Sequence, residues 1–160
     1  MVDAYSMVGL YAGGASAGLG FGVGPSGGLV WRKKSASFPL AWRGDVSASR
    51  FSQQPLTTSG SIAGDASLLH VGAAFGVEWA LMPTSTIRPY VTVSGGVYRF
   101  QGSGPAGANG SAPDGVFSAT TDGALLAGVG LRFGRRLFLE GRVIHVGDFQ
   151  SIPFVIGVHF

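Results

Sequence analysis

Strict alternation of apolar side chains with small or polar ones is the feature that most constrains the fold of this chain. Residues 68–79 show it most clearly: every odd position from Leu69 to Trp79 is apolar, whereas the even positions include His70 and Glu78. A period of two places successive side chains on opposite faces of a β-strand. The segment is therefore predicted to be a strand with one apolar face.

The same period recurs along the whole chain. It divides the sequence into segments at about 4–13, 18–31, 39–50, 68–79, 87–101, 119–133, 136–147 and 152–160. Most of them reach the ~9–11 residues that a tilted strand needs to cross a membrane. The facing of the first segment is ambiguous, whereas the last carries Phe154, Ile156, Val158 and Phe160 on one face.

The connections between these segments alternate in length. Residues 32–38, 81–86 and 134–135 form short connections, whereas 51–65 and 102–118 are long and rich in Gly, Ser, Ala and Pro. Outer-membrane barrels have short periplasmic turns and longer outer loops. Both long connections fall on one side of an eight-stranded barrel, although the other two outer connections, 14–17 and 148–151, are short.

Composition excludes the helical alternative. Hydrophobic residues make up 46% of the chain and charged residues only 12%, about half the usual charged share. The 28 glycines and eight prolines oppose long helices. A closed barrel is the remaining way to cross a bilayer. We therefore predict one all-β domain, residues 1–160, folded as a closed eight-stranded antiparallel up-and-down transmembrane β-barrel.

A soluble antiparallel barrel or sandwich is the alternative to a membrane barrel. It requires polar outward faces on most strands. Apart from Thr121, the segments at 18–31, 68–79, 119–133 and 152–160 have no polar residue on their apolar face. Large aromatic residues also gather beside the predicted periplasmic strand ends, as in an interface girdle: Trp31, Trp42, Trp79, Phe133 and Phe160.

Charged side chains fall on the opposite parity and are predicted to point into the lumen near the same ends. They are Arg43, Asp45, Glu78, Arg88, Arg132, Glu140 and Arg142. Unpaired buried charges cost several kcal/mol each, so we expect interlocked ion pairs. An eight-stranded barrel has room only for side chains or one small ligand. The lumen is therefore predicted to be plugged.

The outer half of the lumen is predicted to be lined by small residues. Glycines alternate at positions 18, 20, 22 and 24, and Gly72, Ala74, Gly128 and Gly130 add to them. They can admit bulky neighbours such as Tyr98 against the backbone, or they can line a small pocket open to the outside.

Basic residues lie at both predicted rims of the barrel. Arg50 and Arg99 have lipid-facing parity near the outer rim, where they can snorkel or pair with lipid phosphates. Residues 32–34 and 135–136 place further basic side chains in periplasmic turns, which we expect to be solvated.

No motif in the sequence indicates catalysis. The lipid A deacylase pattern needs a serine two residues after a histidine, but Val146-Gly147 follows His145. His70 and His159 are predicted inward and His145 outward at different depths, which disfavours a metal site. The net charge is only +3, and the sequence has no basic stripe of the kind that binds nucleic acid. We expect no enzyme activity, cofactor, metal or nucleic-acid partner.

The chain resembles the small bacterial outer-membrane barrels of the OmpA/OmpX-like type over residues 4–160. The resemblance rests on the alternating strands, the aromatic strand ends, the charged lumen and the terminal Val158-His159-Phe160. The resemblance implies an outer-membrane location, contact with outer-membrane lipids, and a terminal strand ending at Phe160 that the assembly machinery recognises. Met1-Val2-Asp3 lacks a basic signal-peptide start, so we expect such a segment to have been removed or replaced by Met1.

Functions diverge widely within this fold. We expect a monomer with a structural or surface-interaction role, displaying the loops at 51–65 and 102–118. A carrier of a small molecule or lipid in the glycine-lined outer lumen is the alternative. A lipid A-modifying enzyme is the third hypothesis.

Overall fold

The computed structural model of the chain describes residues 6–17, 22–34, 40–52, 67–82, 84–103 and 116–160. The described residues form eight strands: β1 (Ser6–Ala17), β2 (Val23–Lys34), β3 (Leu40–Ser52), β4 (Ser67–Ala80), β5 (Ile87–Ser103), β6 (Val116–Phe133), β7 (Leu137–Val146) and β8 (Phe149–His159).

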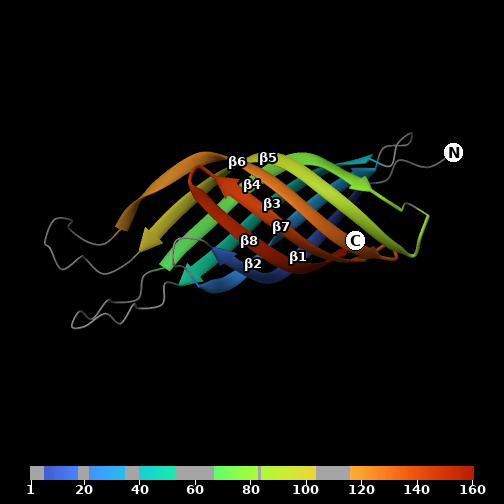
Figure 1. Cartoon of the computed structure of the whole chain (residues 1–160), viewed down its shortest axis with the longest axis horizontal. Coiled ribbons are helices and arrows are strands. Elements are labelled where there is room, and N and C mark those ends of the chain that lie inside the picture. The colour runs from blue at the N-terminus through green and yellow to red at the C-terminus, as the bar shows by residue number, and fades with distance from the viewer. Residues whose placement is uncertain (1–5, 18–21, 35–39, 53–66, 83, 104–115) are drawn as a thin grey trace, which may run out of the picture.

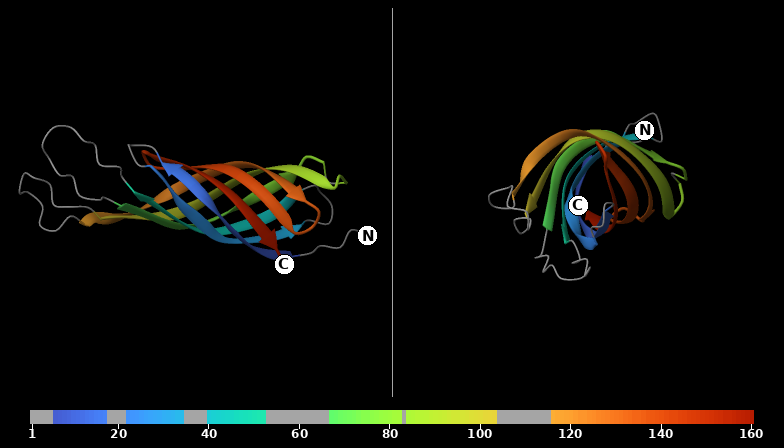
Figure 2. Two further views of the ribbon diagram at one scale, coloured as in Figure 1. Left: turned by 90° about the horizontal axis from the view of Figure 1, so that it is seen from below. Right: turned by 60° about the vertical axis from the view of Figure 1, so that its left-hand side comes forward.

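These strands close into one barrel in which each strand pairs with its sequence neighbours (Figure 1). All eight pairings are antiparallel, and β1 closes the ring against β8 from Gly9 opposite His159 to Ala17 opposite Ser151. Figure 2 shows the strands tilted as they wrap around the barrel axis. Closure satisfies the hydrogen-bonding groups of both edge strands. The predicted eight-stranded up-and-down topology is thereby confirmed.

The strand boundaries correct several expectations at the outer end of the barrel. β1 continues to Ala17 through the connection predicted at 14–17, and β2 begins only at Val23. β5 and β6 also extend further than predicted, to Ser103 and from Val116. Most of the long connections predicted at 51–65 and 102–118 therefore lies outside the described residues, as do positions 18 and 20 of the glycine series.

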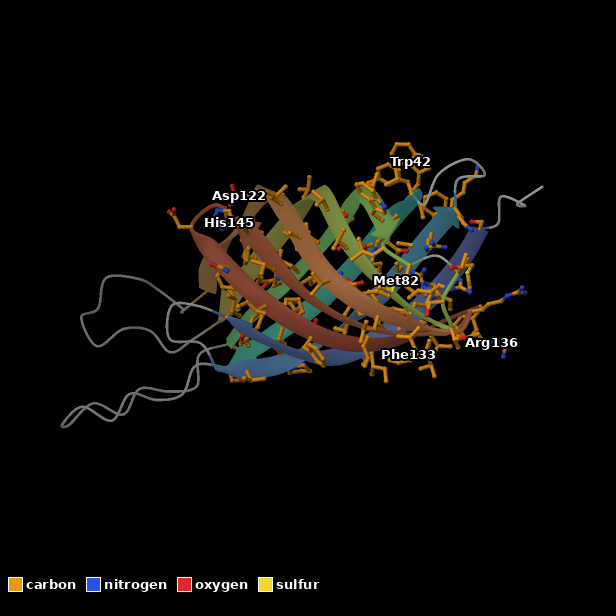
Figure 3. All side chains as sticks on the ribbon, turned by 45° about the vertical axis from the view of Figure 1, so that its right-hand side comes forward. Trp42, Met82, Asp122, Phe133, Arg136 and His145 are labelled. Atoms are coloured by element: carbon orange, nitrogen blue, oxygen red, sulfur yellow. The ribbon has the colours of Figure 1, made fainter. Side chains whose placement is uncertain are left out.

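Apolar side chains cover the outside of the barrel. Val129 is 65% exposed, Phe154 63% and Phe160 74%, and side chains of this kind follow the outer face in Figure 3. Polar and charged side chains are instead buried inside, where Glu78 and Glu140 are each 1% exposed. This distribution inverts that of a soluble protein and suits a barrel that contacts lipid. Within the described residues, no helix is long and apolar enough to span a membrane.

Inward-facing aromatic rings lie directly over glycines of the neighbouring strand. In the strand register, four aromatic residues each face a glycine: Tyr11 and Gly28, Tyr90 and Gly130, Tyr98 and Gly72, Phe138 and Gly157. A Cβ atom at any of these glycines would overlap the facing ring. The missing side chains thus leave room for the rings in a narrow lumen. The structure therefore supports the packing interpretation of Gly72 and Gly130.

Candidate functional site

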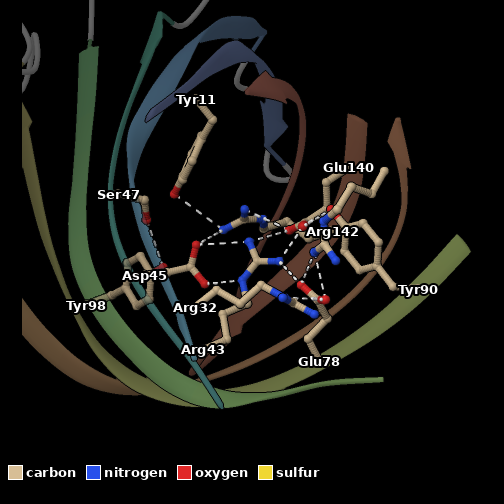
Figure 4. Close-up of polar contacts among 11 residues, drawn as sticks. Tyr11, Arg32, Arg43, Asp45, Ser47, Glu78, Tyr90, Tyr98, Glu140 and Arg142 are labelled. Atoms are coloured by element: carbon tan, nitrogen blue, oxygen red, sulfur yellow. Dashed lines mark hydrogen bonds and ion pairs between the residues drawn. The ribbon is translucent and has the colours of Figure 1, made fainter. Parts of the chain in front are cut away.

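Seven charged side chains meet inside the barrel and form what we call the lumenal network (Figure 4). They come from five strands, and none of the side chains is more than 5% exposed. The members are Arg32, Arg43, Asp45, Glu78, Arg132, Glu140 and Arg142. Each of these side chains occupies a position of its strand that faces the lumen, which brings them together although they lie far apart in the sequence.

Arg43 occupies the centre of the lumenal network. Its guanidinium donates Nε to Asp45 Oδ2 at 2.7 Å and Nη2 to Asp45 Oδ1 at 3.1 Å. Toward Glu140 it donates Nη1 to Oε2 at 2.5 Å and Nη2 to Oε1 at 3.1 Å. Arg43 therefore holds two carboxylates, each through a pair of hydrogen bonds, the geometry in which a guanidinium binds most strongly.

The two glutamates are held by further donors. Glu78 accepts from Arg32 Nε at 2.8 Å and from Arg132 Nη2 at 2.7 Å. Glu140 accepts from the Tyr90 hydroxyl at 2.7 Å. Arg142 Nη2 lies 2.7 Å from Glu140 Oε1, close enough for an ion pair although its angle is unsuited to a hydrogen bond. Each buried carboxylate thus has several cationic or hydroxyl partners.

Four arginines oppose three carboxylates in the lumenal network, which leaves one excess positive charge. Two tyrosine rings lie against arginines: Arg142 is 4.8 Å from the Tyr11 ring centroid, and Arg132 is 5.0 Å from that of Tyr90. The face of an aromatic ring attracts a cation, more strongly away from water. These rings partly compensate the excess charge.

The structure changes the predicted membership of the network at two positions. Arg88 is only half-buried, and its Nε donates to the Ser85 carbonyl at 2.8 Å; among the described residues no ion pair joins it to the lumenal carboxylates. Arg32, expected in a solvated turn, is instead 4% exposed and bound to Glu78. The reason is that β2 continues to Lys34. Arg32 therefore points into the lumen, as Val30 does two residues earlier in the strand.

β3 shows how the lumen is filled beyond the lumenal network. Along its inward face, Ser47 shares a 2.8 Å hydrogen bond with the Tyr98 hydroxyl, Ser49 donates to Ser26 at 2.8 Å, and Phe51 contacts Phe149 edge-on. At the level of Ser49, the His70 ring stacks between those of Tyr98 and Phe100, at centroid distances of 4.4 and 4.6 Å. Aromatic rings therefore occupy the outer lumen.

The expected girdle residues lie at the opposite end from these rings. All five lie within three residues of a strand terminus at that end, namely Trp31, Trp42, Trp79, Phe133 and Phe160. Trp31 and Trp42 both stack on Phe75, at centroid distances of 6.3 and 5.7 Å, and the Trp31 indole donates to Ser6 at 2.8 Å. Figure 3 places Trp42, Phe133 and Arg136 toward one end of the barrel, and Asp122 and His145 toward the other.

The three histidines divide between the lumen and the outer face of the barrel. His70 and His159 are buried in the lumen, whereas His145 is exposed on the outer face. The strand partners of His145 are Leu125 and Gln150, neither of which is a nucleophile. Among the described residues, no three His, Cys, Asp or Glu side chains gather as they would around a metal ion.

Solved structures share this architecture over nearly the whole chain. Ail, the attachment invasion locus protein of Yersinia pestis, solved with the heparin analogue sucrose octasulfate, matches with a TM-score of 0.59 at 12% identity, covering 99% of each chain. Neisserial surface protein A matches with 0.57 at 19% identity, covering 98% of this chain and 97% of that one. A de novo designed transmembrane β-barrel matches with 0.52 at 12% identity, covering 96% and 95%.

The chain has the fold of the small outer-membrane barrels. The structure of the outer-membrane protein Ail in a phospholipid bilayer nanodisc matches at a TM-score of 0.55. The expected resemblance to the fold of eight-stranded outer-membrane barrels is thus confirmed. No protein-family model matches the sequence, and no curated protein matches it either.

Proposed function

We propose that this protein is a monomeric outer-membrane barrel with a sealed lumen that serves as a rigid support for interactions at the cell surface. The lumenal network carries this proposal. Seven buried charged side chains hold five strands together through ion pairs at 2.5–3.8 Å. Since such a network is costly to break, it suits a stable closed support better than a channel that opens.

The ends of the barrel agree with this role. The long connections at 51–65 and 102–118 both leave from the end opposite the tryptophans, where outer loops belong. Two natural neighbours are an attachment invasion locus protein and a surface protein, which supports a surface-interaction role. At the other end, Phe160 is 74% exposed and its N–H donates to the Val8 carbonyl at 2.7 Å. We propose that this strand end is what the outer-membrane assembly machinery recognises.

Cysteine labelling in intact cells tests the location and the orientation, because the native chain contains no cysteine. Asp122→Cys lies near the end that we assign to the outside, and Arg136→Cys lies in the turn at the other end. A membrane-impermeant maleimide should label Asp122→Cys in whole cells but Arg136→Cys only after lysis. Labelling of both or neither in whole cells would contradict the proposed orientation.

Conductance tests the sealed lumen. Inserted into a planar bilayer, the wild-type barrel should show no steady pore, because ion pairs and aromatic rings fill its interior. Gramicidin added to the same bilayer controls for detection of small currents. A stable open level that scales with the amount of inserted barrel would contradict the sealed lumen while leaving the membrane location intact.

A further inference from the structure

Two arginines on the outer face of the barrel lie near the end from which the long connections leave. Arg50 of β3 and Arg99 of β5 are both exposed. No hydrogen bond or ion pair joins either guanidinium to another described side chain or backbone group. Within the part of the chain that the structure describes, both guanidiniums are thus available to a group outside the barrel.

The strand register places these arginines on either side of one apolar strand. Arg50 faces Leu69 of β4, and Arg99 faces Val71 of the same strand. Two strand spacings and a two-residue offset separate their Cα atoms by roughly 12 Å. Leu69 and Val71 are 41% and 40% exposed. Two cations thus flank an apolar strip that cannot hydrogen-bond to them.

A groove of about 240 Å³ opens beside Arg50. The outward-facing residues that line it are the small Pro25, Gly27 and Ala48, together with Leu69 and Arg50. Ser26 and Ser49 also line the groove, but their hydroxyls hydrogen-bond to each other inside the barrel. The outward-facing side chains of the groove are therefore apolar except for the guanidinium of Arg50. A ligand that fits both parts must combine a hydrocarbon chain with an anionic group.

We infer that Arg50 and Arg99 bind the two phosphates of a diphosphorylated glycolipid, with one acyl chain in the groove beside Arg50. This inference rests on the proposed outer-membrane location, because only there does this face meet such a lipid. Charge complementarity selects phosphates, since arginine binds them through paired hydrogen bonds. Two cations held apart on a rigid barrel favour one lipid with two separated phosphates over a lipid with one.

The test compares lipid retention by barrels reconstituted in phosphatidylcholine nanodiscs that contain either diphosphoryl or monophosphoryl lipid A. Native mass spectrometry then counts barrels that keep the glycolipid after release from the disc. The wild type should retain the diphosphoryl form about fivefold more than the monophosphoryl form, as for one added arginine–phosphate contact. Equal retention of the two forms would overturn the inference.

Variants identify the residues responsible. Arg50→Gln and Arg99→Gln should each abolish the preference for the second phosphate, and Ala48→Leu should lower retention of both forms by filling the groove. Arg136→Gln, which removes an exposed arginine at the other end, should change nothing. Unchanged retention in both glutamine variants, or an equal loss in Arg136→Gln, would refute the site.

Gel mobility without heating separates this inference from the proposed function. A compact unheated band shows that each variant still forms the barrel. If all barrels are compact and none prefers the diphosphoryl lipid, the lipid site is wrong and the membrane barrel stands. If the wild type itself fails to insert, the proposed function is wrong. Should a glutamine variant not fold, the comparison of the two lipids on the wild type still decides.

Discussion

Arg43 and Glu140 lie 97 residues apart in the chain and form a two-pronged ion pair across the lumen, through Nη1 to Oε2 and Nη2 to Oε1. The pair connects β3 to β7, which are not neighbours in the sheet. It therefore braces the barrel across its interior, in addition to the backbone ladder around its wall. Paired hydrogen bonds between a guanidinium and a carboxylate are among the strongest in proteins.

Removing the charge of Glu140 should destabilise the barrel. Glu140→Gln leaves Arg43 and Arg142 short of a buried anion, so we expect a loss of about 1–3 kcal/mol in the free energy of unfolding. Urea unfolding of the refolded barrel in lipid vesicles measures this loss. Asp122→Asn is the control, because Asp122 is an exposed carboxylate and should change the midpoint little. Equal midpoints for both variants would mean that the ion pair adds no net stability.

Two adjacent basic residues of β2 should differ sharply. Arg32 is 4% exposed and bound to Glu78, whereas Lys33 is exposed on the other face. Arg32→Gln should cost about 1–3 kcal/mol by depriving Glu78 of a donor, and Lys33→Gln should stay within about 0.5 kcal/mol. The same urea series measures both. A larger effect at Lys33 would show that β2 is displaced by one residue from the register described.

A methyl group at Gly72 should disturb the outer lumen. The Cβ atom of Gly72→Ala would overlap the Tyr98 ring, and overpacking a tight interior costs about 1–3 kcal/mol. Gly123→Ala is the matched control, because nothing lies within 4 Å of its Cβ position. Thermal unfolding, followed as loss of the compact gel band, should shift for Gly72→Ala alone. If both substitutions are neutral, Tyr98 is not held against the backbone of β4.

A charge on the outer face should be tolerated only near the rim. Val93 lies midway along the outward face of β5 and is 53% exposed, whereas Leu137 begins β7 and is 45% exposed. In a bilayer, Val93→Arg should cost about 2–4 kcal/mol, and Leu137→Arg only about 0–1 kcal/mol. Unfolding from lipid vesicles gives both values. Equal small costs would indicate that this face meets water.

Alternation determined the facing of most strands in advance. The outward positions of β4 and β8, such as Phe75 and Phe154, are exposed as predicted. Parity also placed Arg43, Asp45 and Glu140 inside the barrel, where they lie. β1 contains too many small residues for its period to indicate a face, so Tyr11 was not anticipated as the partner of Arg142.

Strand ends were harder to predict from the sequence than strand faces. The basic run at residues 32–34 suggests a turn by composition, but β2 passes through it. Arg88 has the parity of a lumenal residue, but it lies one residue after the start of β5, where its side chain reaches the Ser85 carbonyl instead. A side chain at a strand end has solvent and turn atoms within reach, so parity alone does not decide its partner.

The fold class follows from the sequence alone, because side chains alternate with period two, and closing the sheet puts its polar face in the lumen and its apolar face against lipid. Which charges meet depends on the three-dimensional arrangement of the strands. Ion pairs such as Arg43–Glu140 depend on the register around the ring and on which strands lie across the lumen from each other. Those distances arise from closure of the barrel, and no local pattern along one strand encodes them.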